Sequence, residues 1–404
     1  MAGFDIPDDA RYRHTLSLEL VGTMQMTVGN LAAAATAYEA MARAAEKRAA
    51  AQPDVVARQR DVVVARDKIA EVRLAEGDIA GAIAMFEESR ATLKDIIDKE
   101  PEFEYVRDLA YSYNQTGDAR RISGDVAGAE QDYRVGLKIS AFLVENVPDY
   151  AGYRRDLGVS HSKLGLALRM GNDLEAAQAE YDAALAISRD LSAKSPDDME
   201  LQRDITVSLN AMGDISRLTD DNASAQDFYR QSVEISRKLV ARDPGNTLWR
   251  RDLGLGISKL ADTRQAAGDS RGALTDYQSA LALAQYLAEL DPANAEWQRD
   301  LSFSQNRVGD ALLATGDTKG AADAYQAGYA VAAALLAADP DNVTRILDAA
   351  YSRYKLGIAG LDPVANLEAA RDMLGKLKAD GRLPGANESW VTMVETALKR
   401  AKGG

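Results

Sequence analysis

The polar side chains that could form a binding site recur along this sequence of 404 residues every 47 or 48 positions. Each repeat contains an Arg-Asp pair, and the aspartates of these pairs serve as origins for counting: Asp61, Asp108, Asp156, Asp204, Asp252 and Asp300. Five origins are followed, six residues later, by asparagine or serine: Asn114, Ser162, Asn210, Ser258 and Asn306. An asparagine side chain has two donors and an acceptor, so a row of them could bond an extended polypeptide backbone.

Other polar positions keep the same spacing. Aspartate stands ten residues after four origins: Asp118, Asp214, Asp262 and Asp310. Arginine stands thirteen residues after three of the origins: Arg121, Arg169 and Arg217. Tyr111 and Phe303 follow their origins by three residues. The recurrence of the Arg-Asp pair itself predicts ion pairs that link helices of adjacent copies.

No arrangement of these residues is typical of an enzyme. The sequence has no phosphate-binding GxxxxGK[ST], no GxGxxG after a strand, no HExxH and no GxSxG. Its two histidines, His14 and His161, are far apart, and it has no cysteine. We therefore expect no catalytic residue, no metal site and no cofactor.

Composition narrows the classes of partner. The net charge is −14, which disfavours nucleic acids and anionic membrane surfaces. No apolar run of 18 residues exists, so no transmembrane helix is expected. The N-terminus lacks the pattern of a signal peptide, which favours a cytoplasmic protein, or a periplasmic one whose signal has been removed.

The repeated polar residues must be carried by helices, because each interval has the punctuation of two helices. A Gly-Asp pair lies sixteen and seventeen residues after several origins, as at Gly77-Asp78 and Gly124-Asp125; glycine suits a helix end and aspartate the next helix start. A proline forty residues after each origin ends the second helix, and Asn246, Asn294 and Asn342 suit the start of the next copy. Each helix has roughly 20 residues, or about 30 Å.

Small and aromatic residues complete the pattern. Most copies carry glycine nine residues after the origin, alanine at 21 and an aromatic residue at 25, as in Gly309, Ala321 and Tyr325. This order and spacing resemble the tetratricopeptide repeat (TPR), over nearly the whole chain. The usual repeat has about 34 residues. The roughly 14 extra residues here add about two turns to each helix, which keeps the packing faces in register. The sequence looks like the long-helix arrays of bacterial multidomain and regulatory proteins.

The resemblance implies an all-α, right-handed superhelical solenoid of about eight antiparallel helix pairs. The repeat origins fall near residues 13, 61, 108, 156, 204, 252, 300 and 348, so the array is expected over residues 1–360. Residues 361–404 are predicted to form a degenerate second helix, a Gly/Pro turn at 381–385 and a C-terminal capping helix. Trp390 is expected to pack against the last repeat.

The resemblance also implies a concave groove lined by the first helix of each pair. The groove positions are those that carry Tyr111 and the recurrent Asn, Ser, Asp and Arg residues given above. The alternative is that these residues are only a solvated face. The sequence lacks the paired lysines of the family's carboxylate clamp at these positions. The aspartates there favour a neutral or basic partner.

Two functions remain open. The first is a non-enzymatic scaffold that holds an extended segment of another protein in the groove. The second is a regulatory or oligomerisation module of a signalling or defence enzyme whose effector domain lies elsewhere. The rather apolar first helix motivates the second and predicts a homo-oligomer through the N-terminal repeat; ordinary packing against the second repeat is its alternative. The residues concerned are Leu16, Leu20, Val21, Met24 and Met26.

Overall fold

The computed structural model describes residues 8–27 and 29–403, and within them every regular element is a helix. The chain divides into two compact units, one up to Ile215 and one from Ser216, a division that the repeat pattern did not predict. The first unit holds eight helices and most of a ninth: α1 (Asp8–Thr27), α2 (Leu31–Ala51), α3 (Val56–Glu76), α4 (Ile79–Lys99), α5 (Phe103–Ser123), α6 (Val126–Asn146), α7 (Ala151–Met170), α8 (Leu174–Lys194) and α9 (Met199–Leu218).

The second unit holds the end of α9 and eight further helices, with a short 3₁₀ turn before the last. These are α10 (Asn222–Arg242), α11 (Thr247–Ala266), α12 (Ser270–Leu290), α13 (Ala295–Ala314), α14 (Thr318–Ala338), α15 (Val343–Ile358), α16 (Pro363–Ala379), η1 (Gly385–Asn387) and α17 (Glu388–Gly403). Odd-numbered helices up to α15 are the first helices of the repeats, and even-numbered helices are the second.

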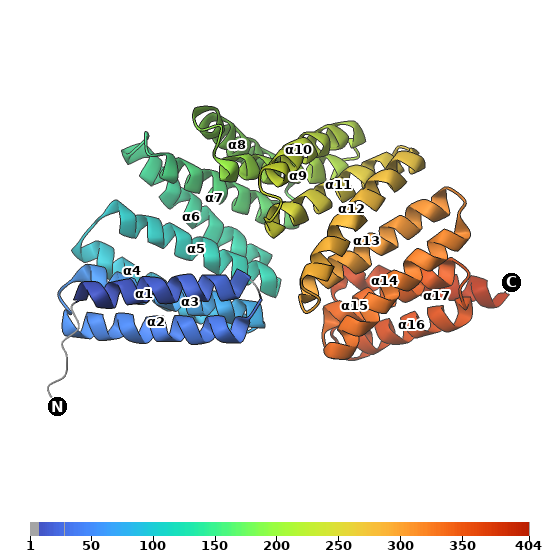
Figure 1. The fold of residues 1–404 in the computed structure, drawn as a ribbon, viewed down its shortest axis with the longest axis horizontal. Coiled ribbons are helices and arrows are strands. Elements are labelled where there is room, and N and C mark those ends of the chain that lie inside the picture. Colours follow the sequence, from blue (N-terminus) through green and yellow to red (C-terminus); the bar gives the residue numbers. More distant parts are fainter. Residues whose placement is uncertain (1–7, 28, 404) are drawn as a thin grey trace. The chain divides into compact units, whose positions relative to one another are not determined.

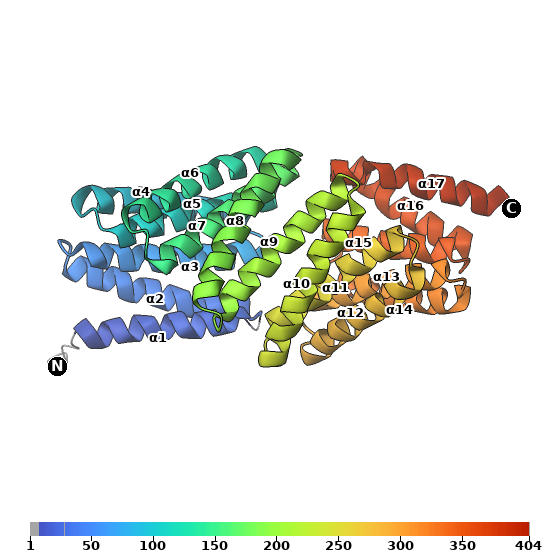
Figure 2. The same cartoon turned by 90° about the horizontal axis from the view of Figure 1, so that it is seen from above.

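Within each unit the helices pack in chain order, α1 to α8 in the first and α10 to α17 in the second (Figures 1 and 2). Successive first helices also contact each other, α3 with α5 and α5 with α7. The predicted helical pairs are therefore confirmed, and each pair buries its apolar face on its neighbours. Side chains on consecutive first helices are consequently brought together from positions about 48 residues apart.

The predicted helix boundaries are confirmed by the caps. Gly77 and Gly124 end α3 and α5 with φ near +90°, a left-handed conformation that glycine adopts without steric cost. The carboxylate of Asp125 then accepts a hydrogen bond from the Gly128 backbone N–H at 2.9 Å and starts α6. Asn246 caps α11 in the same way, through the backbone N–H of Trp249 at 3.0 Å.

The mid-helix glycine makes room for the aromatic ring of the second helix. A Cβ atom on Gly117 would lie 2.5 Å from the ring of Tyr133, and one on Gly309 would lie 2.5 Å from the ring of Tyr325. Both tyrosines are fully buried. The glycine, alanine and aromatic pattern is thus the packing signature of each repeat, as the sequence predicts.

The C-terminal segment ends in a capping helix. Beyond α16, a turn leads into α17, whose Val394 and Leu398 are buried in a cluster with Leu374 and Leu377. The ring of Trp390 packs on this cluster and lies 5.5 Å from the ring of Tyr351 on α15. The last repeat is thereby closed by the final helix.

Candidate interaction site on the first helices

An apolar side chain recurs at one position of the first helices, three residues after each origin, and it is exposed in five of the eight copies and half-buried in the other three. Tyr111 on α5 is 46% exposed, Val207 on α9 is 42% exposed and Leu255 on α11 is 44% exposed. The complete column, which we call the apolar column, is Leu16, Val64, Tyr111, Val159, Val207, Leu255, Phe303 and Tyr351. The position is apolar in all eight copies, so hydrophobicity at this single position is the signal that could have revealed the column from the sequence.

The asparagines six residues after the origin lie deeper than the expected groove row. Asn114 and Asn306 are only 7% and 3% exposed. The side-chain amide of Asn114 donates to Ser160 Oγ of the next first helix at 3.1 Å, and that of Asn306 donates to Ser352 Oγ at 3.0 Å. Asn210, Ser162 and Ser258 are half-buried at the same position. This position is turned toward the following repeat, so Asn114 and Asn306 join repeats instead of standing on an open face.

In four of the five copies, the Asn or Ser at this position is matched in size by a residue of the second helix. The Oδ1 of Asn114 lies against Gly136 of α6, where a Cβ would come within 2.6 Å, and Asn306 lies against Gly328 in the same way. Where serine replaces asparagine, as at Ser162 and Ser258, alanine replaces the glycine, at Ala184 and Ala280. In these four copies the larger side chain is thus paired with the smaller one, whereas the residue that corresponds to Gly136 in the copy of Asn210 is Ser232.

The aspartates ten residues after the origin are already paired with cations. Asp118 accepts a hydrogen bond from the Tyr133 hydroxyl at 2.7 Å and forms an ion pair with Lys163 of the next repeat. The same two contacts recur at Asp310, which accepts hydrogen bonds from Tyr325 at 2.6 Å and Lys355 at 2.7 Å. Asp262 is paired with Tyr277 and Arg307, and Asp214 lies 3.9 Å from Arg169. The aspartates therefore do not form an uncompensated acidic row.

The arginines thirteen residues after the origin do not form one cluster. Arg121 and Arg169 are half-buried, each beside the tyrosine of its own repeat, Tyr133 and Tyr181 respectively. Arg217 is exposed at the end of α9. Of the residues expected to line a groove, only Tyr111 and Arg217 have exposed side chains, and the others are half-buried or buried.

The predicted ion pairs between repeats are confirmed. The guanidinium of Arg155 on α7 donates two hydrogen bonds to the carboxylate of Asp204 on α9, at 2.7 and 3.3 Å. The same two-point contact joins further first helices, through Arg60 and Asp108, Arg107 and Asp156, Arg251 and Asp300, and Arg299 and Asp348. These bridges hold successive first helices at a fixed separation beside the apolar column.

Two pockets open between first helices, at equivalent places in the two units. A pocket of about 340 Å³ lies between α5 and α7 over α6, with Tyr111 and Val159 in its lining. A pocket of about 200 Å³ lies between α11 and α13 over α12, with Leu255 and Phe303 in the same roles. Each is thus flanked by two members of the apolar column and by an Arg-Asp bridge.

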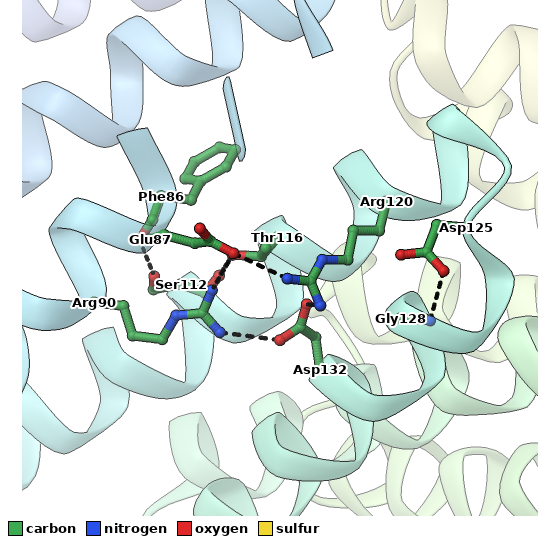
Figure 3. Close-up of polar contacts among 9 residues, drawn as sticks. All are labelled: Phe86, Glu87, Arg90, Ser112, Thr116, Arg120, Asp125, Gly128 and Asp132. Carbon is green, nitrogen blue, oxygen red and sulfur yellow. Dashed lines mark hydrogen bonds and ion pairs between the residues drawn. The ribbon is translucent and has the colours of Figure 1, made fainter. Parts of the chain in front are cut away.

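A second polar cluster lies away from this face, among α4, α5 and α6 (Figure 3). The buried guanidinium of Arg90 donates to Asp132 at 2.9 Å and to Thr116 at 3.3 Å, and Arg120 also pairs with Asp132 at 3.0 Å. Burial is the main cause that raises the pKa of Asp132 above its usual value, against the lowering effect of these arginines. The cluster joins three helices and is not open to a partner, so we read it as structural.

Over the part of the chain that the structure describes, no group of acidic or histidine side chains could hold a metal ion, and no helix has the length and apolarity needed to cross a membrane. Its stacked helix pairs and their glycine, alanine and aromatic packing define a tetratricopeptide-like repeat protein.

Comparison with solved structures agrees with this class. The tetratricopeptide-sensor protein PH0952 from Pyrococcus horikoshii, a signal transduction ATPase with numerous domains, matches with a TM-score of 0.52 and 15% identity, over 91% of this chain and 54% of that one. The apo form of RapI matches with a TM-score of 0.50 and 14% identity, over 80% of this chain and 97% of that one. No protein-family model and no curated protein matches the sequence. At these identities the likeness defines the fold alone.

Proposed function

We propose that this protein is a non-enzymatic interaction scaffold that binds an extended segment of another protein along the exposed side of its first helices. The apolar column carries the proposal, because it repeats an apolar side chain at a fixed spacing and leaves it exposed at Leu16, Tyr111, Val159, Val207 and Leu255. An isolated exposed apolar residue is common on protein surfaces, whereas a row of them marks a surface that is covered by a partner.

The side chains proposed to contact the partner differ from those that the sequence suggested. The buried asparagines are taken up in joining repeats, so Tyr111, Val159 and their equivalents supply the contact surface instead. The cations paired with the aspartates also remove the electrostatic reason for a neutral or basic partner. Any preference for the charge of the partner is then set by individual pockets along this face.

Affinity capture from the native cell tests this function. The variant Tyr111→Ser/Val159→Ser/Val207→Ser removes three neighbouring members of the apolar column without touching the core. We expect a protein captured by the unaltered chain to be lost, because the variant replaces its apolar contact area with hydroxyls.

The matched control changes exposed apolar residues on second helices, Val135→Ser/Phe142→Ser/Leu290→Ser. The control should capture the same protein as the unaltered chain. Capture that survives in the first variant and is lost in the control would place the binding surface on the second helices and refute the proposal.

A second candidate function, self-association through α1, is favoured by a specific observation. Val21 and Met24 are 47% and 60% exposed. Met24 corresponds to positions that are buried in later repeats: Val72, Ala119, Ala167 and Ile215. We propose that a second copy of the chain covers this face, as a preceding repeat covers it elsewhere.

A further inference from the structure

The pocket between α11, α12 and α13 has a largely apolar lining. Leu255 and Phe303 come from the apolar column, Leu283 and Leu287 come from α12, and Trp297 comes from the start of α13. Gly254 and Ala284 also line it, and small side chains there leave the space open. Such a hollow can accept one bulky apolar side chain and remove it from water.

The charged residues that line this pocket are mainly cations, although the chain as a whole is acidic. Four cations, Arg250, Arg251, Lys259 and Arg307, and one carboxylate, Asp300, are among its lining residues, and two further carboxylates, Glu296 and Asp262, pair with Arg251 and Arg307. The equivalent pocket between α5 and α7 is balanced, with three cations and three carboxylates: Arg60, Arg107, Lys163, Glu104, Asp108 and Asp156. Within a Debye length of about 8 Å, the local charge outweighs the net charge of the chain.

Arg250 is the cation least neutralised by its contacts. Its guanidinium donates to the backbone carbonyl of Pro244 and lies 3.9 Å over the ring of Tyr286. Neither group carries a negative charge. By contrast, Arg251 is paired with Asp300 and Glu296, and Arg307 is paired with Asp262. A carboxylate arriving at the mouth would therefore find an arginine that is available to it.

We propose that this pocket receives a bulky apolar side chain of a partner segment, and that an adjacent Asp or Glu of the segment pairs with Arg250. The inference deepens the proposed function and rests on it, because the pocket opens beside the apolar column along which the segment would run. It assigns an acidic, apolar sequence to the part of the partner that crosses α11 and α13, in contrast to the neutral or basic partner expected from the sequence.

Three fluorescein-labelled peptides test the pocket directly by fluorescence anisotropy. The first carries Phe between two Glu residues in a glycine-rich context, the second carries Phe between two Lys residues, and the third replaces Phe by Ser between two Glu residues. We expect the first to bind at least about tenfold more tightly than either of the others, since a single good charge pair or a buried ring is worth roughly 1.4 kcal/mol or more. Equal or tighter binding of the Lys peptide would overturn the proposal, and so would the absence of binding by the first.

Two variants locate the binding. Leu255→Glu places a carboxylate at the mouth and should weaken the first peptide about tenfold, and Arg250→Gln should weaken it without altering the apolar wall. The matched control is Val135→Glu, at an exposed apolar position of the second helix α6 and outside the apolar column, which should leave the affinity unchanged. Circular dichroism of each variant checks that it is folded.

Equal loss in Leu255→Glu and Val135→Glu would refute the pocket as the site. The proposed function is judged separately, by the capture experiment on α5, α7 and α9. If the peptides do not bind as expected but the apolar column still captures a partner, only the role of this pocket is refuted.

Discussion

Asp67 is a buried acidic residue whose ionisation affects the stability of its repeat. It lies six residues after Asp61, at the position that Asn114 and Asn306 occupy in later repeats, and it is only 7% exposed. Burial, followed by the nearby charge of Glu71, raises the pKa of Asp67 to about 7. A neutral carboxylic acid therefore replaces the neutral amide below that pH, and a buried charge replaces it above.

The raised pKa makes stability depend on pH. The folded state holds the proton up to about pH 7, whereas the unfolded state releases it near pH 4. Stability is therefore highest below pH 4 with respect to this group, and it is lost progressively as the pH rises to 7, by about 4 kcal/mol at most. We expect Asp67→Asn, which copies the sibling repeats, to raise the urea midpoint at pH 8 and to change it little at pH 4.

The control for this prediction is the same substitution at an exposed acid. Asp125→Asn keeps a capping side chain and should show the same small change at both pH values. An Asp67→Asn variant that is less stable than the parent at pH 8 would show that the carboxylate is held there by a favourable interaction.

The pairing of Asn114 with Gly136 gives a second prediction at this scale. Gly136→Ala places a Cβ 2.6 Å from the Asn114 Oδ1, and we expect a loss of about 1–3 kcal/mol in unfolding free energy. Adding Asn114→Ser reproduces the combination found at Ser258 and Ala280, and should restore at least half of the loss. A double-mutant cycle in urea measures this coupling. Additive losses would mean that the two positions do not share the space.

Among the helices, the two kinds of ion pair should differ in energetic weight. Asp132 is 5% exposed and faces two arginines, so Asp132→Ala leaves the buried Arg90 with only its longer ion pair to Glu87, at 3.9 Å, and should cost about 3–5 kcal/mol. Asp156→Ala removes a pair whose side chains are 31% and 43% exposed, and should cost less than about 1 kcal/mol. Chemical unfolding of the two variants tests the ranking. A larger loss in Asp156→Ala would indicate that the bridges between first helices act as one cooperative row.

At the scale of the whole molecule, the two ends of the chain carry different surfaces. The outward residues of α17 are polar, including Thr392, Glu395 and Lys399. The exposed face of α1 carries Leu20 and Met24, at 62% and 60% exposure. A terminal repeat normally needs a polar outer face to remain soluble, so α1 is suited to an apolar contact and α17 is not.

Light scattering tests the self-association that this difference implies. We expect a mass near twice 43.5 kDa at high protein concentration, because the apolar face of α1 pairs with the same face of a second copy. The variant Val21→Ser/Met24→Ser should return the protein to a monomer. A monomeric parent at high concentration would exclude this candidate function.

The repeat length, the helix pairs, the caps and the glycine-aromatic packing could all be predicted from the sequence. Each depends on residues close together in the chain, or on positions that recur so regularly that the copies align one another. Examples are the packing of Tyr133 on Gly117 and the bridge between Arg155 and Asp204. In both, the residue types alone indicate the kind of contact that is made. The likeness of solved structures supports the same fold.

The tertiary structure decided which polar residues are available to a partner. Consecutive positions on a helix differ by about 100° in direction, so a shift of a few residues moves a side chain from the open face to the junction between repeats. The neighbouring helix therefore determined that Asn114 is buried, that Asp118 is neutralised by Lys163, and that Leu255 remains exposed beside a pocket. Those outcomes depend on contacts between residues about 48 positions apart, which no local pattern specifies.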